Sequence, residues 1–300
     1  MAEGLPARRS RTRGARRRLL LPPQVVQARH RFVTATLVYL RLAAAAVRAN
    51  MGQPLFLAVR TVAAGLIVVV EVTAVVLLLD RFGTIGGWRA PEVVLLFGLA
   101  FASQGLALAL GNRLEADHLS LLVRKGTFDQ VLTRPVSPLG WLVASYVDAR
   151  YLGRLLAGVG AVAWAGDRAG VAWSAGTVAL VALAVVSAAA VVFAVLLIAA
   201  AFTFVSVQGS EAGSMLVYGG TYLASYPMQI YGSALRLVFV WLVPVALAIY
   251  VPALVVLGRQ GPPGLPAWLA WLTAPVSAAF LAVGGLAWRG GVRRYVGAGS

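Results

Sequence analysis

Residues 171–205 read VAWSAGTVALVALAVVSAAAVVFAVLLIAAAFTFV and carry no charged side chain. A helix needs about 20 consecutive apolar residues to cross about 30 Å of hydrocarbon, so this stretch is longer than one crossing requires. Because it contains no turn signal that would divide it into two crossings, we expect one long helix that projects from the bilayer. A segment of this kind indicates an integral membrane protein built from helices.

The composition of the whole chain agrees with that stretch. The mean hydropathy is +0.83 and only 12% of the residues are charged, values outside the range of soluble domains. The alternation typical of a membrane β-barrel is absent, so the predicted fold class is all-α. The lack of cysteine excludes disulfides, thiolate metal sites and cysteine nucleophiles. With His30 and His118 in separate regions, we expect no metal site.

Apolar segments before and after residues 171–205 are also long enough to cross a membrane, and we predict six transmembrane helices. The predicted spans are 55 or 61 to 79, 92–110, 141–166, 171–205, 237–258 and 267–288. The fifth should be kinked by Pro244 and Pro252. The first half of the third, with Asp148, Arg150 and Arg154, should face protein, water or headgroups. The moderately apolar stretch 215–231 should be interfacial or re-entrant.

Basic residues are concentrated near the N-terminus. Residues 1–24 are rich in arginine, proline and glycine, which favours a disordered tail, and residues 25–50 have the mixed pattern of an interfacial helix. We expect residues 25–300 to form one transmembrane domain of the cell membrane. Because cytoplasmic segments of membrane proteins carry the excess of basic residues, we also expect both termini to lie in the cytoplasm. The net charge of +16 then reflects orientation and attraction to lipid headgroups rather than nucleic-acid binding.

One charged stretch interrupts the apolar sequence: residues 111–138 read GNRLEADHLSLLVRKGTFDQVLTRPVSP. Leu114, Leu121 and Leu122 share a helical face, and Gly126 can end that helix. Thr127 and Gln130 have the spacing of a capping box for a second short helix. The stretch is therefore predicted to form two short amphipathic helices on the cytoplasmic side.

Two interpretations of these short helices remain open on periodicity alone. They could rest on the inner leaflet as interfacial helices. They could instead form a docking element that carries Asp129 and Arg134 to a soluble partner. In either case, Ser137 followed by Pro138 is typical of the first turn of the next helix.

Three passages resemble the ABC-2 family of permeases, the membrane subunits of ATP-binding-cassette exporters, over about residues 25–300. VRKGTFDQVLTRPVSPLG at 123–140 is similar to the family's glycine, acidic, leucine and Arg-Pro-Val-Ser-Pro pattern. YPMQIYGSALRLVFVWLVPVALAIYVPALVVLG at 226–258 is similar to its Tyr-Pro, Leu-Arg and proline series. WRGGVRRYVGAGS at 288–300 is similar to its Arg-Arg-Tyr end.

The resemblance implies that residues 111–138 are a coupling region that inserts into a nucleotide-binding subunit. The candidate coupling residues are Glu115, Gly126, Asp129, Leu132, Arg134, Pro135, Val136, Ser137 and Pro138. The chain contains no GxxxxGK(S/T) motif, so we expect ATP and Mg²⁺ on the ATPase partner, with no catalytic residue and no cofactor on this chain. Two ATPase sites per transporter imply a second permease chain, identical or a related sister.

The resemblance favours export of a hydrophobic, amphipathic or cationic compound. Glu71, Tyr222 and Tyr226 are candidate contacts along its pathway, although such tyrosines are also typical of an interfacial belt. Glu71 permits an alternative, an ion-coupled secondary transporter, because acids near mid-membrane are often functional; it could also simply pair with a neighbouring helix. A lipid-modifying enzyme is disfavoured, since neither Glu71 nor Asp148 lies near a histidine or in a recognisable motif.

Overall fold

The computed structural model describes residues 23–204, 210–260, 266 and 268–295. The chain divides into two units, residues 1–38 and 39–300. In the first unit, the described residues belong to helix α1, which runs Pro23–Met51 and confirms that the segment predicted at 25–50 is helical. The tail predicted for residues 1–24 lies almost entirely outside the described residues.

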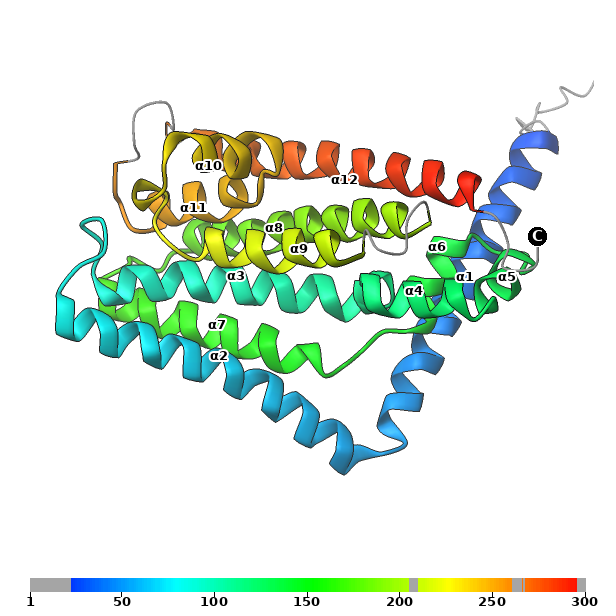
Figure 1. Cartoon of the computed structure of the whole chain (residues 1–300), viewed down its shortest axis with the longest axis horizontal. Coiled ribbons are helices and arrows are strands. Elements are labelled where there is room, and N and C mark those ends of the chain that lie inside the picture. The colour runs from blue at the N-terminus through cyan, green and yellow to red at the C-terminus, as the bar shows by residue number, and fades with distance from the viewer. Residues whose placement is uncertain (1–22, 205–209, 261–265, 267, 296–300) are drawn as a thin grey trace, which may run out of the picture. The chain divides into compact units, whose positions relative to one another are not determined.

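The second unit is built from helices (Figure 1). After the last part of α1 come α2 (Pro54–Phe82), α3 (Ala90–Gly111), α4 (Ala116–Arg124), α5 (Thr127–Leu132), α6 (Pro138–Ser145), α7 (Tyr151–Ala169), α8 (Ala175–Thr203), α9 (Ser210–Ala224), α10 (Ser233–Leu237), α11 (Val245–Val256) and α12 (Leu269–Arg294). Within the described residues the only β pairing is an isolated bridge between Ile85 and Trp88. The all-α prediction is therefore confirmed.

Helix α3 lies at the centre of this unit. Its side chains are almost all buried, because α7 packs along one side and α8 along another. Helix α8 packs in turn against α12 (Figure 1). Helix α2 contacts mainly α7 and leaves most of its valine and leucine side chains exposed. An apolar face that protein does not cover is suited to lipid or to another membrane helix.

Four of the described helices are long and apolar enough to cross a membrane: Pro54–Phe82, Ala90–Arg124, Ala175–Thr203 and Leu269–Arg294. They correspond to the predicted first, second, fourth and sixth spans. Helix α8 is one continuous helix, as expected for residues 171–205. It begins at Ala175 because Ser174 caps it, with Oγ accepting a hydrogen bond from the Thr177 amide at 3.2 Å.

The third predicted span is not one helix. Residues 146–150 separate α6 from α7, where the sequence predicted continuity over 141–166. In this break the amide of Asp148 donates a hydrogen bond to the carbonyl of Ala109 on α3 at 3.0 Å. The Asp148 amide therefore donates to α3, whereas in a continuous helix it would donate to a carbonyl of its own helix.

The charged residues of this segment face protein, as predicted. Arg154 on α7 donates a hydrogen bond to Oε1 of Gln104, which is buried within α3. Asp148 forms an ion pair with Arg150 at 3.0 Å. Each of these charged side chains therefore has a polar or charged partner inside the unit.

The fifth predicted span consists of two segments. Ser233–Leu242 and Val245–Val256 are inclined at 95° to each other, a sharper change than the kink expected at Pro244. Pro252 stays inside α11 without ending it. At 1.5 Å per residue α11 is about 18 Å long, short of the about 30 Å of hydrocarbon. The segment is a broken span or a re-entrant loop, and not a continuous helix.

Candidate functional site

The charged stretch 111–138 forms two short helices, α4 and α5, as predicted. They are separated at Gly126, whose φ of 65° lies in the left-handed region that favours glycine. The predicted capping box is wrong, because Gly126 itself is the N-cap of α5. The Thr127 hydroxyl instead donates a hydrogen bond to the Leu122 carbonyl of α4 at 3.1 Å. Thr127 therefore ties the two short helices together.

One face of α5 is anchored by Phe128, which is fully buried. The centroid of its ring lies 4.9 Å from that of Phe204, at the end of α8. It lies 6.5 Å from the ring of Trp288 and 5.1 Å from that of Tyr295, both at the end of α12. A displacement of α5 would therefore act directly on the ends of α8 and α12.

The end of α5 and the residues directly after it are exposed. Leu132 is 40% exposed, and Arg134 and Pro135 are exposed as well. The guanidinium carbon of Arg134 lies 4.5 Å from the ring centroid of Trp141 on α6, a cation–π contact that restrains the arginine. Within the described residues no side-chain hydrogen bond or ion pair engages the Asp129 carboxylate. We call Asp129, Leu132, Arg134 and Pro135 the α5 surface.

Ser137 and Pro138 begin α6, as predicted. Ser137 is the N-cap, its Oγ accepting a hydrogen bond from the Gly140 amide at 3.1 Å, and Pro138 occupies the first turn. The Ser137 hydroxyl also lies 3.0 Å from the hydroxyl of Tyr39, in the last part of α1. These residues position the chain that follows the α5 surface.

Glu115 does not lie on the α5 surface. Its side chain is 14% exposed, and its carboxylate accepts hydrogen bonds from the hydroxyls of Tyr218 on α9 and Tyr151 on α7. His118 Nδ1 lies 3.7 Å from the same carboxylate. The structure therefore places Glu115 inside the unit, where it joins the start of α4 to α7 and α9, and apart from the α5 surface.

Glu71 and Tyr222 are brought together by the fold. The Tyr222 hydroxyl on α9 donates a hydrogen bond to Oε1 of Glu71 on α2 at 2.8 Å. The Tyr222 ring packs edge-on against Phe101, and the Tyr226 ring packs edge-on against Phe97, both on α3. Glu71 thus pairs with a neighbouring helix, as one of the interpretations of the sequence predicted.

A polar pocket of about 430 Å³ opens at the break between α6 and α7. Its walls come from the end of α1, the start of α2, the residues after α3 and the break itself. The Asp148 carboxylate forms ion pairs with Arg150 Nε at 3.0 Å and with Arg60 at 3.5 Å, and it accepts a hydrogen bond from Asn112 Nδ2 at 3.3 Å. Local sequence reasoning singled out Asp148 and Arg150, but no local pattern joins them to Arg60 and Asn112.

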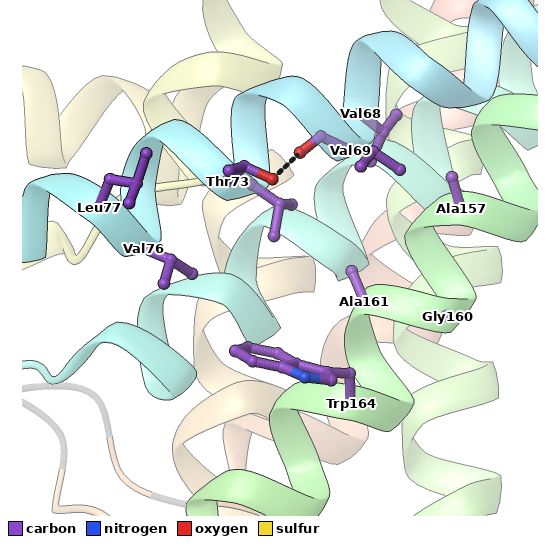
Figure 2. A pocket seen from close by; sticks show the side chains of 10 residues that line it. Val68, Val69, Thr73, Val76, Leu77, Ala157, Gly160, Ala161 and Trp164 are labelled. Carbon is purple, nitrogen blue, oxygen red and sulfur yellow. Dashed lines mark hydrogen bonds between the residues drawn. The ribbon is translucent and has the colours of Figure 1, made fainter. Parts of the chain in front are cut away.

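An apolar groove of about 520 Å³ lies between α2 and α7 (Figure 2). It is lined by valine, leucine, alanine and glycine, with Trp164 at one side. The one hydroxyl among its lining residues, that of Thr73, donates a hydrogen bond to the Val69 carbonyl of its own helix at 2.7 Å (Figure 2). The groove can therefore hold an apolar chain but offers little for polar recognition.

The closest approach of α2 and α7 separates the groove from the pocket. A Cβ added to Gly153 of α7 would lie 1.8 Å from the carbonyl oxygen of Thr61 on α2, so no residue with a side chain fits there. The pocket residues Arg60 and Arg150 precede this crossing in their helices, and the groove residues follow it. Within the described residues, no group of three or more acidic or histidine side chains could hold a metal ion.

Comparison with known proteins identifies one match. A family model described as ABC-2 family transporter protein matches residues 66–299. No curated protein and no solved structure matches the chain. The matched residues include the α5 surface, the break before α7 and the bent pair of α10 and α11.

Proposed function

The chain belongs to the ABC-2 family of transporter proteins, and from that premise we propose that it is an export permease driven by a separate ATPase subunit. As a family member it is a membrane component of an ABC transporter system. The sequence carries no phosphate-binding loop motif, so ATP and Mg²⁺ belong on the partner, and this chain needs no cofactor of its own.

The α5 surface is the proposed docking site for the ATPase, and one observation carries this proposal: α5 is anchored near its start by a buried residue and is exposed at its end. Leu132 and Arg134 are exposed, whereas Phe128 is buried among side chains from the ends of α8 and α12. A partner that closes on nucleotide can push on the exposed end, and Phe128 passes the movement to two membrane helices. Glu115 extends the same linkage to α7 and α9 through its tyrosine partners.

For the membrane topology we propose six crossings, by α2, α3, α7, α8, α9 and α12. The bent pair of α10 and α11 is assigned as a re-entrant segment, because both of its ends meet the region between α2 and α3. Before the pair, Gln229 accepts a hydrogen bond from Trp88 Nε1 at 3.1 Å. After it, Arg259 pairs with Glu92 at 2.8 Å. The proposal keeps six crossings and assigns the fifth to α9 in place of 237–258; α9 itself is about 22 Å long, so length does not distinguish it from α11, and the contacts at the two ends of the bent pair carry the assignment.

The orientation follows from the basic residues. Arginines at the start of the chain and at the end of α12 favour the cytoplasm of the cell for both termini. Figure 1 places α4 and α5 at the same end of the unit as the last turn of α12, and the bent pair at the other end. Under this orientation the α5 surface faces the cytoplasm and the re-entrant pair lies on the outer side.

Two ATPase sites need two coupling regions, so we propose a dimer of permease chains, identical or paired with a sister. The exposed valine and leucine side chains of α2 leave apolar surface for lipid or for that second chain. For the substrate we propose a hydrophobic, amphipathic or cationic organic compound, with Glu71, Tyr222 and Tyr226 in contact. The family favours this over an ion-coupled carrier at Glu71, whose carboxylate is engaged by Tyr222.

Photo-crosslinking in native membranes tests the docking site. A photoreactive amino acid at Leu132 should trap an ATPase subunit, identified by mass spectrometry. The same group at Arg168, an exposed position at the far end of α7, should not. In the purified complex, Asp129→Ala and Arg134→Ala should each lower ATP hydrolysis while leaving the permease inserted. Crosslinking to the ATPase from Arg168 but not Leu132, or unchanged hydrolysis in both variants, would refute the assignment.

A further inference from the structure

We propose that the polar pocket binds the phosphate group of an anionic lipid headgroup. Arg60, Arg113 and Arg150 line it, and Asp148 is the only carboxylate among its lining residues. Positive charge therefore remains after Asp148 has paired with two of the arginines. Guanidinium groups match phosphate oxygens in both charge and geometry, and bind them with paired hydrogen bonds.

Two donors in the pocket lack acidic or hydrogen-bonding partners within the described residues. Arg113 forms no ion pair there; its guanidinium carbon lies 4.1 Å from the ring centroid of Tyr146, which holds it beside the pocket. The Ser145 hydroxyl is buried without a hydrogen-bond partner. A buried polar group without a partner is unfavourable, and a phosphate oxygen would satisfy both donors.

Apolar surface next to the pocket favours a lipid over a soluble phosphate. Leu55, Phe56 and Val59 are 78, 57 and 59% exposed on the turns of α2 that lead to Arg60. Acyl chains can lie along this surface while the headgroup reaches the arginine. Under the proposed orientation, the pocket opens at the cytoplasmic leaflet, where anionic lipids attract basic side chains.

A bound headgroup would connect three parts of the fold. Arg60 lies near the start of α2, Arg113 follows α3, and Arg150 immediately precedes α7. One phosphate shared among them would link α2, α3 and the start of α7 at this end, in addition to the packing contacts between these helices. Lipid binding should therefore raise the thermal stability of the whole chain, and this effect does not depend on the ATPase or on the transported compound.

The test uses the full chain purified in a neutral detergent. Native mass spectrometry and thermal unfolding are followed with phosphatidylglycerol, phosphatidylcholine or inorganic phosphate. Wild type should retain phosphatidylglycerol and gain stability from it, more than from phosphatidylcholine. Arg113→Gln should weaken that binding about tenfold or more, because a hydrogen bond to a charged group is lost. Ser145→Ala should weaken it less.

Arg168→Gln is the matched control, since Arg168 also stacks on an aromatic ring, that of Trp164 at 5.4 Å, but lies away from the pocket. It should bind phosphatidylglycerol as wild type does. Equal responses to the two lipids, or full binding by a folded Arg113→Gln, would overturn the proposal. If inorganic phosphate stabilises wild type as much as phosphatidylglycerol does, and Arg113→Gln abolishes the effect of phosphate, then the pocket binds phosphate but the proposal that a lipid supplies it is overturned. If Arg113→Gln does not fold, the proposal is tested by the two remaining measurements: the weaker binding of phosphatidylglycerol by Ser145→Ala, and the preference of wild type for phosphatidylglycerol over phosphatidylcholine.

Discussion

The polar pocket and the apolar groove lie on opposite sides of one helix crossing, and they differ in almost every chemical respect. The groove is bordered by α2 and α7 and the pocket by α2 and the break before α7, and the two helices touch at Gly153 and Thr61. Before the crossing the walls carry arginines and Asp148; after it they carry valine and alanine. The backbone thus makes two cavities of similar size, and the side chains alone decide which can bind a charged group.

The largest expected effect comes from removing the crossing itself. In Gly153→Leu the new side chain would collide with the Thr61 carbonyl, so α2 and α7 must separate. The loss should exceed the about 1–3 kcal/mol typical of overpacking, and little monodisperse protein should survive purification. Gly160→Ala is the control on the same helix, because nothing lies within 4 Å of its added Cβ. Wild-type yield of Gly153→Leu would contradict the close contact.

The second-largest effect is expected when one acidic residue is introduced into the groove and, separately, into the pocket. Ala161→Asp puts a charge into the groove and should cost about 2.5–3.5 kcal/mol of membrane insertion. Ala46→Asp puts the same charge beside the arginines of the pocket and should cost less than about 1 kcal/mol. Steady-state membrane level and glycosylation mapping report insertion. Equal losses at both positions would show that the two cavities do not differ in polarity.

A smaller effect is expected where the pocket loses its own carboxylate. Asp148→Asn leaves Arg60 and Arg150 without their acidic partner and should destabilise the chain by about 1–2 kcal/mol, as part-buried ion pairs do. Thermal unfolding in detergent without added lipid measures this. The control Asp167→Asn removes an exposed carboxylate whose hydrogen bond comes from Trp173. An Asp148→Asn protein as stable as the control would refute the structural role of Asp148.

The smallest effect is expected in the groove. Thr73→Val keeps the shape of the side chain and removes a hydroxyl that bonds only within its own helix. The free energy of unfolding should change by no more than about 0.5 kcal/mol, and the response to phosphatidylglycerol should stay that of wild type. A loss of transport in this variant with stability unchanged would instead mean that the Thr73 hydroxyl contacts the substrate.

Features with a strong local signal could be predicted from the sequence. The absence of charge and turn residues over 171–205 predicted the single helix α8. Glycine at position 126 predicted the division between α4 and α5, because its neighbours follow helical periodicity and glycine readily adopts a positive φ. The residues of the α5 surface came from the family resemblance and not from periodicity. The aromatic partners of Phe128 could not be predicted, since they come from helices far along the chain.

Features that depend on contacts between distant segments could not be predicted. The break before α7 depends on the Asp148 amide bonding to α3, and local hydropathy cannot reveal that bond. Glu115 looked like a surface charge because its tyrosine partners lie on two other helices. The polar pocket joins residues separated by about half of the unit in sequence, and Gly153 is one glycine among 32. Only the packed structure distinguishes it from the rest.

The sharp bend between α10 and α11 has a consequence for the biogenesis of the protein. At the bend the chain leaves helical geometry, and hydrocarbon offers no partner for backbone groups released there. Helix α11 is buried from Val245 to Leu254 by neighbours that include α8 and α12. Because α12 is synthesised after the bend, α11 cannot be fully packed against its neighbours until α12 has entered the membrane. Assembly of the end of the unit that holds the bend must therefore be among the final steps of maturation.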